Sequence, residues 1–435
     1  MTEPKNYHPL VVFRILFGLL TLFSSLRFLF KGWIEELYLS PILHFKYYGF
    51  GWVNVASPSL TYILFGLMIC CSIFILLGLF YRISTVLFFL LFTYFELIDL
   101  TNYLNHYYFV SLMAFLMIFL PTHVNFSLDT KFGWTKKRDK IPAWTIYSLQ
   151  LQLAIVYFFA GIAKLNSDWL LEAQPLSIWL SPHTNLPLIG PFMDQKITAY
   201  LFSFGGAIFD LAIPFLLWNK FSRKYAYIFV VIFHVLTSLL FPIGVFPFVM
   251  ILSTLIFFSP TFHKKILNLL GHSSSEIEPT SEPKIKANKV LKAGIIAFFM
   301  FQFLFPFRYL LYPGDLFWTE QGYRFSWRVM LMEKAGYASF KVFPYGDERS
   351  IAINNAEFLT PQQEKMMSTQ PDFILQYAHF LGKQFHVENY DTPRVTVESY
   401  VSINGKGSQL YVKKDVDLMP LKNTLKPITF LEKYK

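Results

Sequence analysis

Residues able to do chemistry are few in this 435-residue chain, and most lie inside long apolar stretches. Ionisable side chains are costly in the hydrocarbon core of a membrane, so those found there are candidates for a functional site. Nine residues of this kind interrupt the apolar stretches: Arg14, Arg27, Glu96, Asp99, His106, Lys164, Asp210, His234 and Arg308. We expect Arg27, Asp99 and Arg308, close to helix ends, to reach the membrane interface or to pair there. Arg14 could pair with Glu96 or Asp210 between helices.

Lys164 is the most informative of these residues. It ends the apolar run 156–164, in which Ala160, Gly161 and Ala163 would let another helix or a flat ligand approach closely. A lysine shielded from water loses its proton more easily and can act as a base. The alternative is an exposed ion pair with Asp168, four residues on, worth about 0.2–0.5 kcal/mol. These residues alone do not decide between a base and an ion pair.

Two histidines lie within apolar stretches. His106 follows Asn105 at the outer end of the fourth stretch, and the two side chains could hydrogen-bond a ligand hydroxyl or carbonyl. His234 lies in the middle of a later stretch, and either histidine could instead satisfy a neighbouring helix. Histidines four residues apart, cysteines at ligand spacing and phosphate-binding glycine loops are all missing from the sequence. We therefore predict no metal site, and basic loops without interleaved aromatics predict no nucleic-acid partner.

The composition indicates the class of protein in which these residues lie. Hydrophobic residues make up 54% of the chain and charged residues 15%, against about 25% charged in soluble domains. So much apolar surface excludes a disordered chain or a single soluble domain, and it predicts an all-α polytopic membrane bundle over residues 1–312. A spanning helix needs roughly 20 apolar residues. Nine stretches approach this length: 10–30, 59–80, 83–103, 105–121, 143–164, 197–218, 225–241, 243–260 and 292–312. The connection at 241–244 is so short that the eighth stretch could be part of a hairpin or a broken helix.

Lysine and arginine positions predict the orientation of the bundle. Taking the connections alternately, one side carries 16 Lys and Arg residues and the other carries three. Cytoplasmic loops carry the excess of positive charge. The N-terminus is therefore predicted to be cytoplasmic, with residues 313–435 in the periplasm or a lumen. The net charge of +10 is then a sign of topology and not of an acidic partner.

Residues 313–435 differ from the rest, with 15 Lys and Arg against 14 Asp and Glu. They predict a small α+β domain outside the cytoplasm. Strands are expected at 337–343 and 349–353 around a turn at 344–347, and at 394–403 and 409–413 around Asn404-Gly405. A helix is expected at 362–384, after Thr360-Pro361. The Ser-, Glu- and Pro-rich segment 273–283 is predicted to be a linker.

Several short strings, in order along nearly the whole chain, together resemble the vitamin K-dependent gamma-glutamyl carboxylases. They are VFRILFG at 12–18, GLFYRIS at 78–84, NHYY at 105–108, VYFFAGIAKL at 156–165 followed by Asp168-Trp169, FH at 233–234, LFPIGVF at 240–246, Trp318, Tyr323, Ser326-Trp327 and VSIN at 401–404. Each string is weak by itself, whereas the ordered set is fairly specific.

The resemblance implies a chemistry. Enzymes of this family oxidise vitamin K hydroquinone with O2 to the epoxide. The strong oxygen base formed removes a γ-proton from a glutamate of a secreted or membrane protein, and CO2 then adds. The resemblance implies that Lys164 deprotonates the hydroquinone and that Asn105 and His106 lie near the quinone head group. It further implies substrate-binding or supporting roles for His234, Arg308, Trp318 and Tyr323. An aromatic bundle would dissolve the quinone and shield a reactive alkoxide from water.

The chain also departs from the animal enzymes. Tyr309 and Met332 stand where those enzymes have histidines, and the cysteines of their lumenal disulfide are missing. These differences leave open whether glutamate is the acceptor. The compact chain suggests a bacterial member, in which menaquinol could be the reductant. Two alternatives stand beside the enzyme: a non-catalytic member of the bundle family that binds a lipid or quinone or chaperones a secreted protein, and a transporter. The absence of an internal sequence repeat disfavours the transporter.

Overall fold

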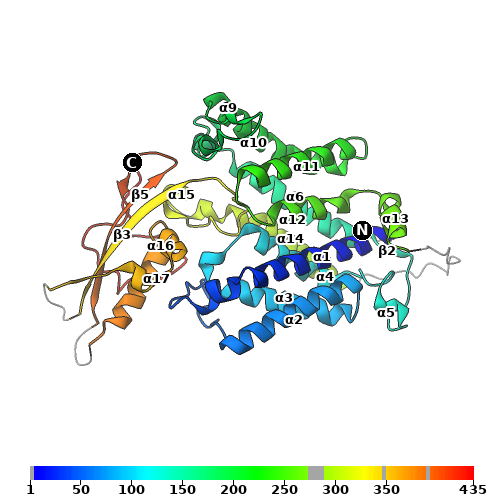
Figure 1. The fold of residues 1–435 in the computed structure, drawn as a ribbon, viewed down its shortest axis with the longest axis horizontal. Coiled ribbons are helices and arrows are strands. Elements are labelled where there is room, and N and C mark those ends of the chain that lie inside the picture. Colours follow the sequence, from blue (N-terminus) through cyan, green and yellow to red (C-terminus); the bar gives the residue numbers. More distant parts are fainter. Residues whose placement is uncertain (1–3, 273–288, 345–348, 388–391) are drawn as a thin grey trace.

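The computed structural model describes residues 4–272, 289–344, 349–387 and 392–435. Long helices run side by side in a bundle, and a small sheet with its own helices lies beyond one end of that bundle (Figure 1). This arrangement confirms the predicted helical membrane bundle with a small α+β region at the C-terminus. The predicted linker at 273–283, and all of the predicted turn at 344–347 except Pro344, lie outside the described residues.

All nine predicted apolar stretches contain helices. They are α1 (His8–Phe30), α2 (Pro58–Leu77), α3 (Tyr81–Ile98), α4 (Asn105–Phe119), α6 (Ala143–Ala163), α10 (Lys196–Trp218), α11 (Arg223–Leu240), α12 (Phe246–Thr254) and α14 (Lys289–Leu304). Among the described residues, seven helices are long and apolar enough to cross a membrane, or eight if a bent pair is one span. The predicted number, nine with an error of one or two, includes these values. The difference arises because α4 has only 15 residues and α12 only nine.

The sharp bend at the end of the eighth stretch, between Phe257 and Pro260, has a local cause. The segment Phe246–Phe257 meets α13 (Pro260–Leu269) at 119°. Pro260 cannot donate a backbone hydrogen bond, and the Ser259 side chain accepts one from the backbone N–H of Phe262. These two features start a new helix instead of continuing the old one. At the connection 241–244, where the sequence left a hairpin or a broken helix open, α11 and α12 are two separate helices that pack against each other.

Within the described part of the chain, Arg14 forms no ion pair with an acidic residue, contrary to our expectation. It is buried in α1, and its guanidinium donates to the backbone carbonyls of Phe126 (2.6 Å) and Thr122 (3.3 Å). Gly78, in the left-handed conformation that ends α2, lies against the guanidinium, and a Cβ at Gly78 would clash with it. Arg14 therefore holds the loop after α4 against α1 and α2.

Asp99 was expected to reach the membrane interface or to pair there, and it has partners at the end of its helix. The side chain is buried at the end of α3. Its Oδ1 accepts hydrogen bonds from the backbone N–H (2.9 Å) and hydroxyl (2.8 Å) of Thr101. Its Oδ2 accepts from Gln363 Nε2 at 2.9 Å. Asp99 thus caps one turn and ties the bundle to the C-terminal domain. Arg27 lies over the ring of Trp33 at 4.6 Å, near the end of α1.

The C-terminal domain is built on a four-stranded antiparallel sheet of order β4-β3-β5-β6. The strands are β3 (Lys334–Phe343), β4 (Ile351–Ala352), β5 (Arg394–Ile403) and β6 (Gln409–Leu410), with Lys334 opposite Ile403. The predicted helix 362–384 is two helices, α16 (Pro361–Met367) and α17 (Pro371–Gln384), because Pro371 cannot continue the first. The predicted strands are otherwise confirmed.

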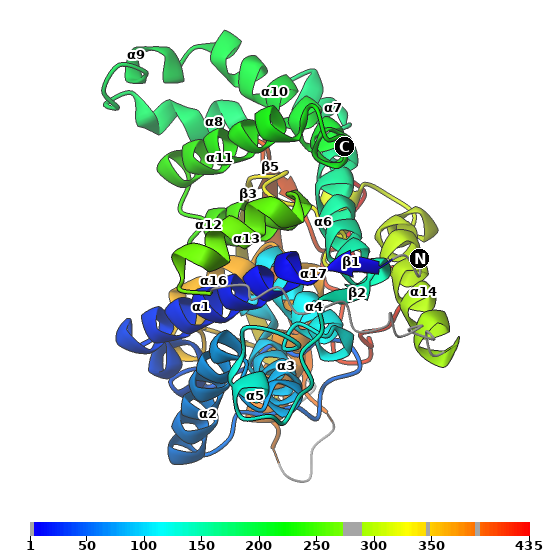
Figure 2. The same cartoon turned by 90° about the vertical axis from the view of Figure 1, so that its right-hand side faces the viewer.

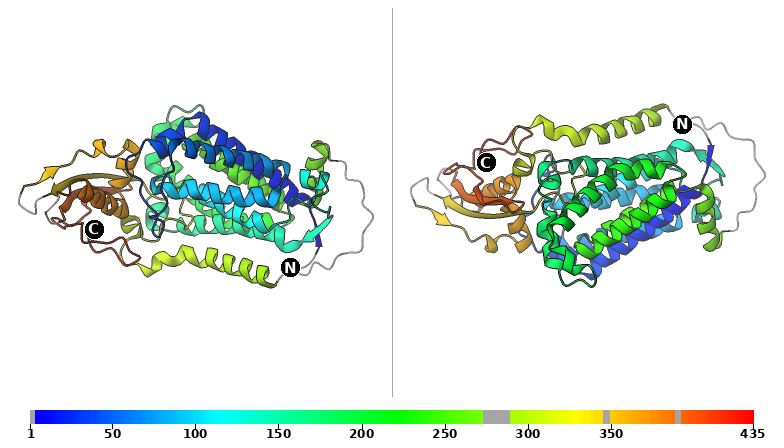
Figure 3. Two further views of the ribbon diagram at one scale, coloured as in Figure 1. Left: turned by 90° about the horizontal axis from the view of Figure 1, so that it is seen from below. Right: turned by 90° about the horizontal axis from the view of Figure 1, so that it is seen from above.

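The C-terminal domain packs against the end of the bundle through a shared hydrophobic core. Residues of the sheet and α17 pack in one cluster with Phe45, Leu100, Trp169 and Phe241 from the bundle's connections and helix ends. Figures 2 and 3 show α1 between the α2–α3 side and the α10–α11 side, with α14 along one flank. The connections at this end therefore bring side chains from distant helices together beneath the sheet.

Candidate functional site

Lys164 is positioned by the close packing of α6 against α10. A Cβ built at Gly161 would lie 2.8 Å from the backbone nitrogen of Leu211 in α10, so only glycine permits this approach. The small residues before Lys164 therefore admit another helix, one of the two possibilities that the sequence offered. Lys164 follows the last residue of α6 and is buried.

Lys164 forms an ion pair with Asp210 of α10. Its Nζ lies 2.6 Å from Asp210 Oδ2, and the two side chains are 8% and 7% exposed. The same Nζ donates to the carbonyl of Ala160 at 3.3 Å. It also lies 5.3 Å from the ring centre of Trp169, and that ring is held by a 2.8 Å hydrogen bond from its Nε1 to the Ser203 carbonyl. Removing one partner of a buried pair costs about 3–5 kcal/mol, because the other charge is left uncompensated.

The alternative pairing of Lys164 with Asp168 is wrong. Asp168 Oδ2 accepts a hydrogen bond of 2.7 Å from Asn404, and its Oδ1 lies 2.8 Å from Lys406 Nζ. Both partners belong to the C-terminal domain, at and just beyond the end of β5. Asp168 therefore joins this domain to the bundle and leaves Lys164 to Asp210.

His234 lies close to the ion pair, on the facing helix α11. Its Nε2 is 3.1 Å from the hydroxyl of Tyr157, which is also 3.3 Å from the Thr254 hydroxyl. The Nδ1 of His234 is buried and has no hydrogen-bond partner among the described residues. Tyr157 precedes Lys164 by two helical turns on α6. A ligand hydroxyl or carbonyl could pair with the free Nδ1.

His106 packs near the same phenylalanine ring as His234. The rings of His106 and His234 lie 5.8 Å and 5.5 Å from the ring of Phe246, at the start of α12. Asn105, next to His106, faces elsewhere: its Oδ1 accepts from the Tyr103 hydroxyl at 3.0 Å and its Nδ2 donates to the Arg328 carbonyl at 3.0 Å. The oxygen and the NH2 group of an amide can each take a second hydrogen bond, so Asn105 keeps some capacity for a ligand.

The other three predicted site residues lie on the C-terminal side. Arg308, in the turn after α14, donates to the Ser326 hydroxyl (2.8 Å) and to the carbonyls of Phe305 (3.0 Å) and Arg324. Trp318 donates to the Glu432 carbonyl at 2.7 Å. Tyr323 packs on Phe317, at a ring distance of 6.2 Å, and burial raises the pKa of its hydroxyl. The structure thus joins Lys164, Asp210, His234 and His106 in one region and Arg308, Trp318 and Tyr323 in another.

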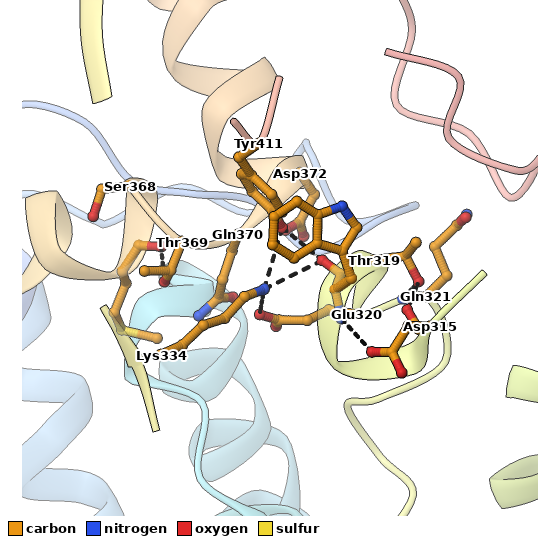
Figure 4. Close-up of polar contacts among 12 residues, drawn as sticks. Asp315, Thr319, Glu320, Gln321, Lys334, Ser368, Thr369, Gln370, Asp372 and Tyr411 are labelled. Atoms are coloured by element: carbon orange, nitrogen blue, oxygen red, sulfur yellow. Dashed lines mark hydrogen bonds and ion pairs between the residues drawn. The ribbon is translucent and has the colours of Figure 1, made fainter. Parts of the chain in front are cut away.

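A buried charge network in the C-terminal domain escaped the sequence reasoning (Figure 4). Lys334 Nζ lies 2.8 Å from Glu320 Oε1 and 3.2 Å from the Tyr411 hydroxyl, which donates to the Trp318 carbonyl. Burial lowers the pKa of Lys334, and Glu320 opposes that shift. The paired residues are 14 or more positions apart in the sequence, so local spacing could not predict these contacts.

A large cavity lies on the other side of α4. It has a volume of about 1,040 Å3 between α3, α4, α14 and the C-terminal domain. Arg308 lines it, whereas the other predicted site residues are not among its lining side chains. Among the residues that the structure describes, no group of three or more His, Cys, Asp and Glu side chains is arranged to hold a metal ion.

Comparison with known families places the chain. The family model of the HTTM domain matches residues 2–262. The model of the lumenal domain of vitamin K-dependent gamma-carboxylase matches residues 287–435, which include α14 and the C-terminal domain. No solved structure matches the chain. The two models in this order are characteristic of one group of proteins, and the chain belongs to the vitamin K-dependent gamma-glutamyl carboxylase family.

Proposed function

We propose that this protein is a quinol-dependent carboxylase with a coupled epoxidase activity. It would oxidise vitamin K hydroquinone, or menaquinol, with O2. One oxygen atom would enter the epoxide, and the other would leave as water after taking the γ-proton of a protein glutamate. CO2 would then form a new carbon–carbon bond at the resulting carbanion. The observation that carries this proposal is the buried Lys164, which lies in the family-like string 156–165 and has its Nζ 2.6 Å from Asp210 Oδ2.

Lys164 is proposed to be the base that takes the hydroquinone proton. In the ionised pair its amine already holds a full set of protons, so it cannot accept another. Asp210 Oδ2, at 2.6 Å, is an acceptor to which one proton can pass. That transfer leaves a neutral amine beside a neutral acid and keeps the pair hydrogen-bonded. The pair would therefore store a proton between turnovers without an uncompensated charge.

His234, His106 and Asn105 are proposed to hold the quinol head group. The free Nδ1 of His234 supports this role, and His106 lies on the same Phe246 ring. Arg308, Trp318 and Tyr323 would support the peptide substrate from the C-terminal side. We also propose a division into a bundle, 1–312, and a domain, 313–435, with the N-terminus cytoplasmic. The distribution of 16 basic residues against three supports this orientation.

The test uses purified full-length protein with reduced vitamin K or menaquinol, O2, labelled bicarbonate and a glutamyl peptide. Lys164→Ala should lower epoxide formation and peptide labelling by about 10²–10⁴-fold, as expected for loss of a base, and an added primary amine should restore part of it. Lys196→Ala, an exposed lysine on α10, is the matched control and should keep full activity.

Each outcome bears on a separate part of the proposal. Unchanged epoxide formation in Lys164→Ala would refute its role as the base. Epoxide without labelled peptide would retain the oxygenase and reject the carboxylase. Quinol binding without any turnover of the native chain would favour the non-catalytic lipid- or quinone-binding alternative, which the large cavity supports.

A further inference from the structure

One wall of the cavity is α14, a helix that is largely exposed. Gln302 is the single buried residue of α14, and its Nε2 donates to the Tyr108 hydroxyl at 3.2 Å. One turn earlier on α14, Phe298 stacks on Phe115 of α4 at a ring distance of 5.6 Å. Apart from such contacts α14 is loosely attached to the bundle, and Figure 3 shows it along one flank. In a membrane, hydrocarbon chains are the molecules that fill such a space.

The walls of the cavity are apolar at one end and polar at the other. Phe89 on α3, Phe115 on α4, and Phe298 and Phe301 on α14 form the apolar part. Glu96 follows Phe89 by seven residues, which on a helix is about 10 Å. That depth fits within one leaflet, whose hydrocarbon layer is roughly 15 Å, half of the bilayer core. The cavity thus matches a single amphiphile with its head near the C-terminal domain.

An acidic and a basic side chain without charged partners among the described residues, Glu96 and Arg308, line the polar end. Of the other charged residues there, Glu320 pairs with Lys334 and Arg324 with Asp372, whereas Lys422 and Lys426 are exposed to solvent. Glu96 lies near the end of α3 and forms no hydrogen bond or ion pair with the described residues. Arg308, on the α14 side, meets carbonyl and hydroxyl oxygens but no carboxylate in the described part of the chain. Three of its five N–H donors are used in these bonds, which leaves two free. A charge held in a largely apolar site is stable when a ligand of opposite charge pairs with it.

We propose that this cavity binds one phosphatidylethanolamine molecule of the leaflet next to the C-terminal domain. Its primary ammonium would donate to Glu96, its phosphate would accept from the free donors of Arg308, and its acyl chains would lie between α4 and α14. The lipid would then complete the packing of α14, which the protein itself leaves open. Arg308 would then hold the lipid headgroup in addition to its proposed support of the peptide substrate.

Other lipids of the membrane fit the charges less well. A quinol is neutral and would leave both Glu96 and Arg308 without a counter-charge. Phosphatidylglycerol offers a phosphate to Arg308 but no cation to Glu96. Phosphatidylcholine has the right charges, but its quaternary ammonium has no N–H to donate. The extra hydrogen bond to a charged group should make the affinity for phosphatidylethanolamine about tenfold higher than that for phosphatidylcholine.

The experiment measures lipid retention and does not depend on catalysis. The full-length chain is delipidated in detergent and mixed with equimolar phosphatidylethanolamine, phosphatidylcholine and phosphatidylglycerol of identical acyl chains. Native mass spectrometry then counts the lipids retained. We expect one phosphatidylethanolamine per chain, about tenfold over the other two. Glu96→Gln should reduce it to the level of phosphatidylcholine, whereas Glu36→Gln, an exposed acid of the α1–α2 connection, should not.

Two further variants keep the proposal testable if Glu96→Gln fails to fold. Phe115→Trp, which fills the apolar end, should lower the retention of all three lipids together. Arg308→Gln should weaken binding of phosphatidylethanolamine and phosphatidylcholine alike, because they share the phosphate. Equal retention of the three lipids by the native chain would overturn the proposal. So would an unchanged preference in Glu96→Gln, or one-for-one displacement of phosphatidylethanolamine by menaquinone.

Discussion

Replacing Asp210 with asparagine tests whether the buried pair with Lys164 holds α6 and α10 together. The substitution keeps the shape of the side chain and removes its charge. Lys164 then retains only the Ala160 carbonyl at 3.3 Å and the face of Trp169 at 5.3 Å. Neither group carries the negative charge needed to balance an ammonium at a buried position.

The expected magnitude follows from the burial of both partners. Their side chains are 8% and 7% exposed and their charged atoms lie 2.6 Å apart. Breaking such a pair costs about 3–5 kcal/mol of unfolding free energy, since one charge stays buried and unpaired. Lys164→Met should cost as much, because it leaves the carboxylate of Asp210 alone. The double variant carries neither charge and should lose no more stability than either single variant.

The assay is a double-mutant cycle on the purified chain. The free energy of unfolding is measured by adding a denaturing detergent to mixed micelles and following helical circular dichroism. Lys196→Met, an exposed lysine at the start of α10, is the control and should change little. If the losses of the two single variants add in the double variant, the pair does not contribute to stability and the reasoning is wrong. A folded but inactive double variant would separate the stabilising role of Lys164 from its chemistry.

Two further changes probe the packing of α6 on α10 and the loop after α4. Gly161→Ala places a methyl group 2.8 Å from the Leu211 backbone and should lower the free energy of unfolding by about 1–3 kcal/mol in the same assay. The control is Gly205→Ala, whose methyl group meets open space and should be tolerated. Equal losses in the two variants would contradict the close approach of α6 and α10. Burial, with arginines nearby, lowers the pKa of His123 from 6.5 to about 3, so its contribution to stability is complete above pH 6.5 and falls as the pH drops toward 3. His123→Phe, which keeps a ring against Tyr81, should lose less stability than the native chain between pH 6.5 and 4, by up to about 1.4 kcal/mol per pH unit, and parallel pH profiles would rule this out.

The elements of the fold were largely predictable from the sequence because their causes are local. Apolar runs of 18 or more residues gave helices, and alternating valines gave β5. Breaks within an element were harder to foresee. Pro371 divides one amphipathic pattern into α16 and α17, because the apolar periodicity continues there while the backbone hydrogen bonds do not. The eighth apolar stretch ends close to the observed bend of 119° at Ser259-Pro260, but its helix α12 has only nine residues.

The partners of the charged residues could not be predicted. Arg14 finds carbonyls more than 100 residues away, and Lys164 finds an acid 46 residues away. Composition shows that a charge in an apolar stretch needs a partner, but only the packing of helices selects it. For Lys164 the nearest acid in the sequence, Asp168, faces the C-terminal domain instead. Local spacing was therefore a poor guide, since the chain leaves its helix between the two residues.

The sequence offered two roles for Lys164, a base or half of an ion pair, and its buried position is compatible with both. An exposed pair with Asp168 would have kept the amine hydrated and of no special reactivity. The buried pair with Asp210 instead keeps the amine out of water, held by α10 and by the ring of Trp169. Among the described carboxylates, Asp210 alone forms an ion pair with this amine. A proton that passed from the amine to Asp210 would leave a neutral base at the α6–α10 contact, so the contact that holds these helices together would also supply the proposed chemistry.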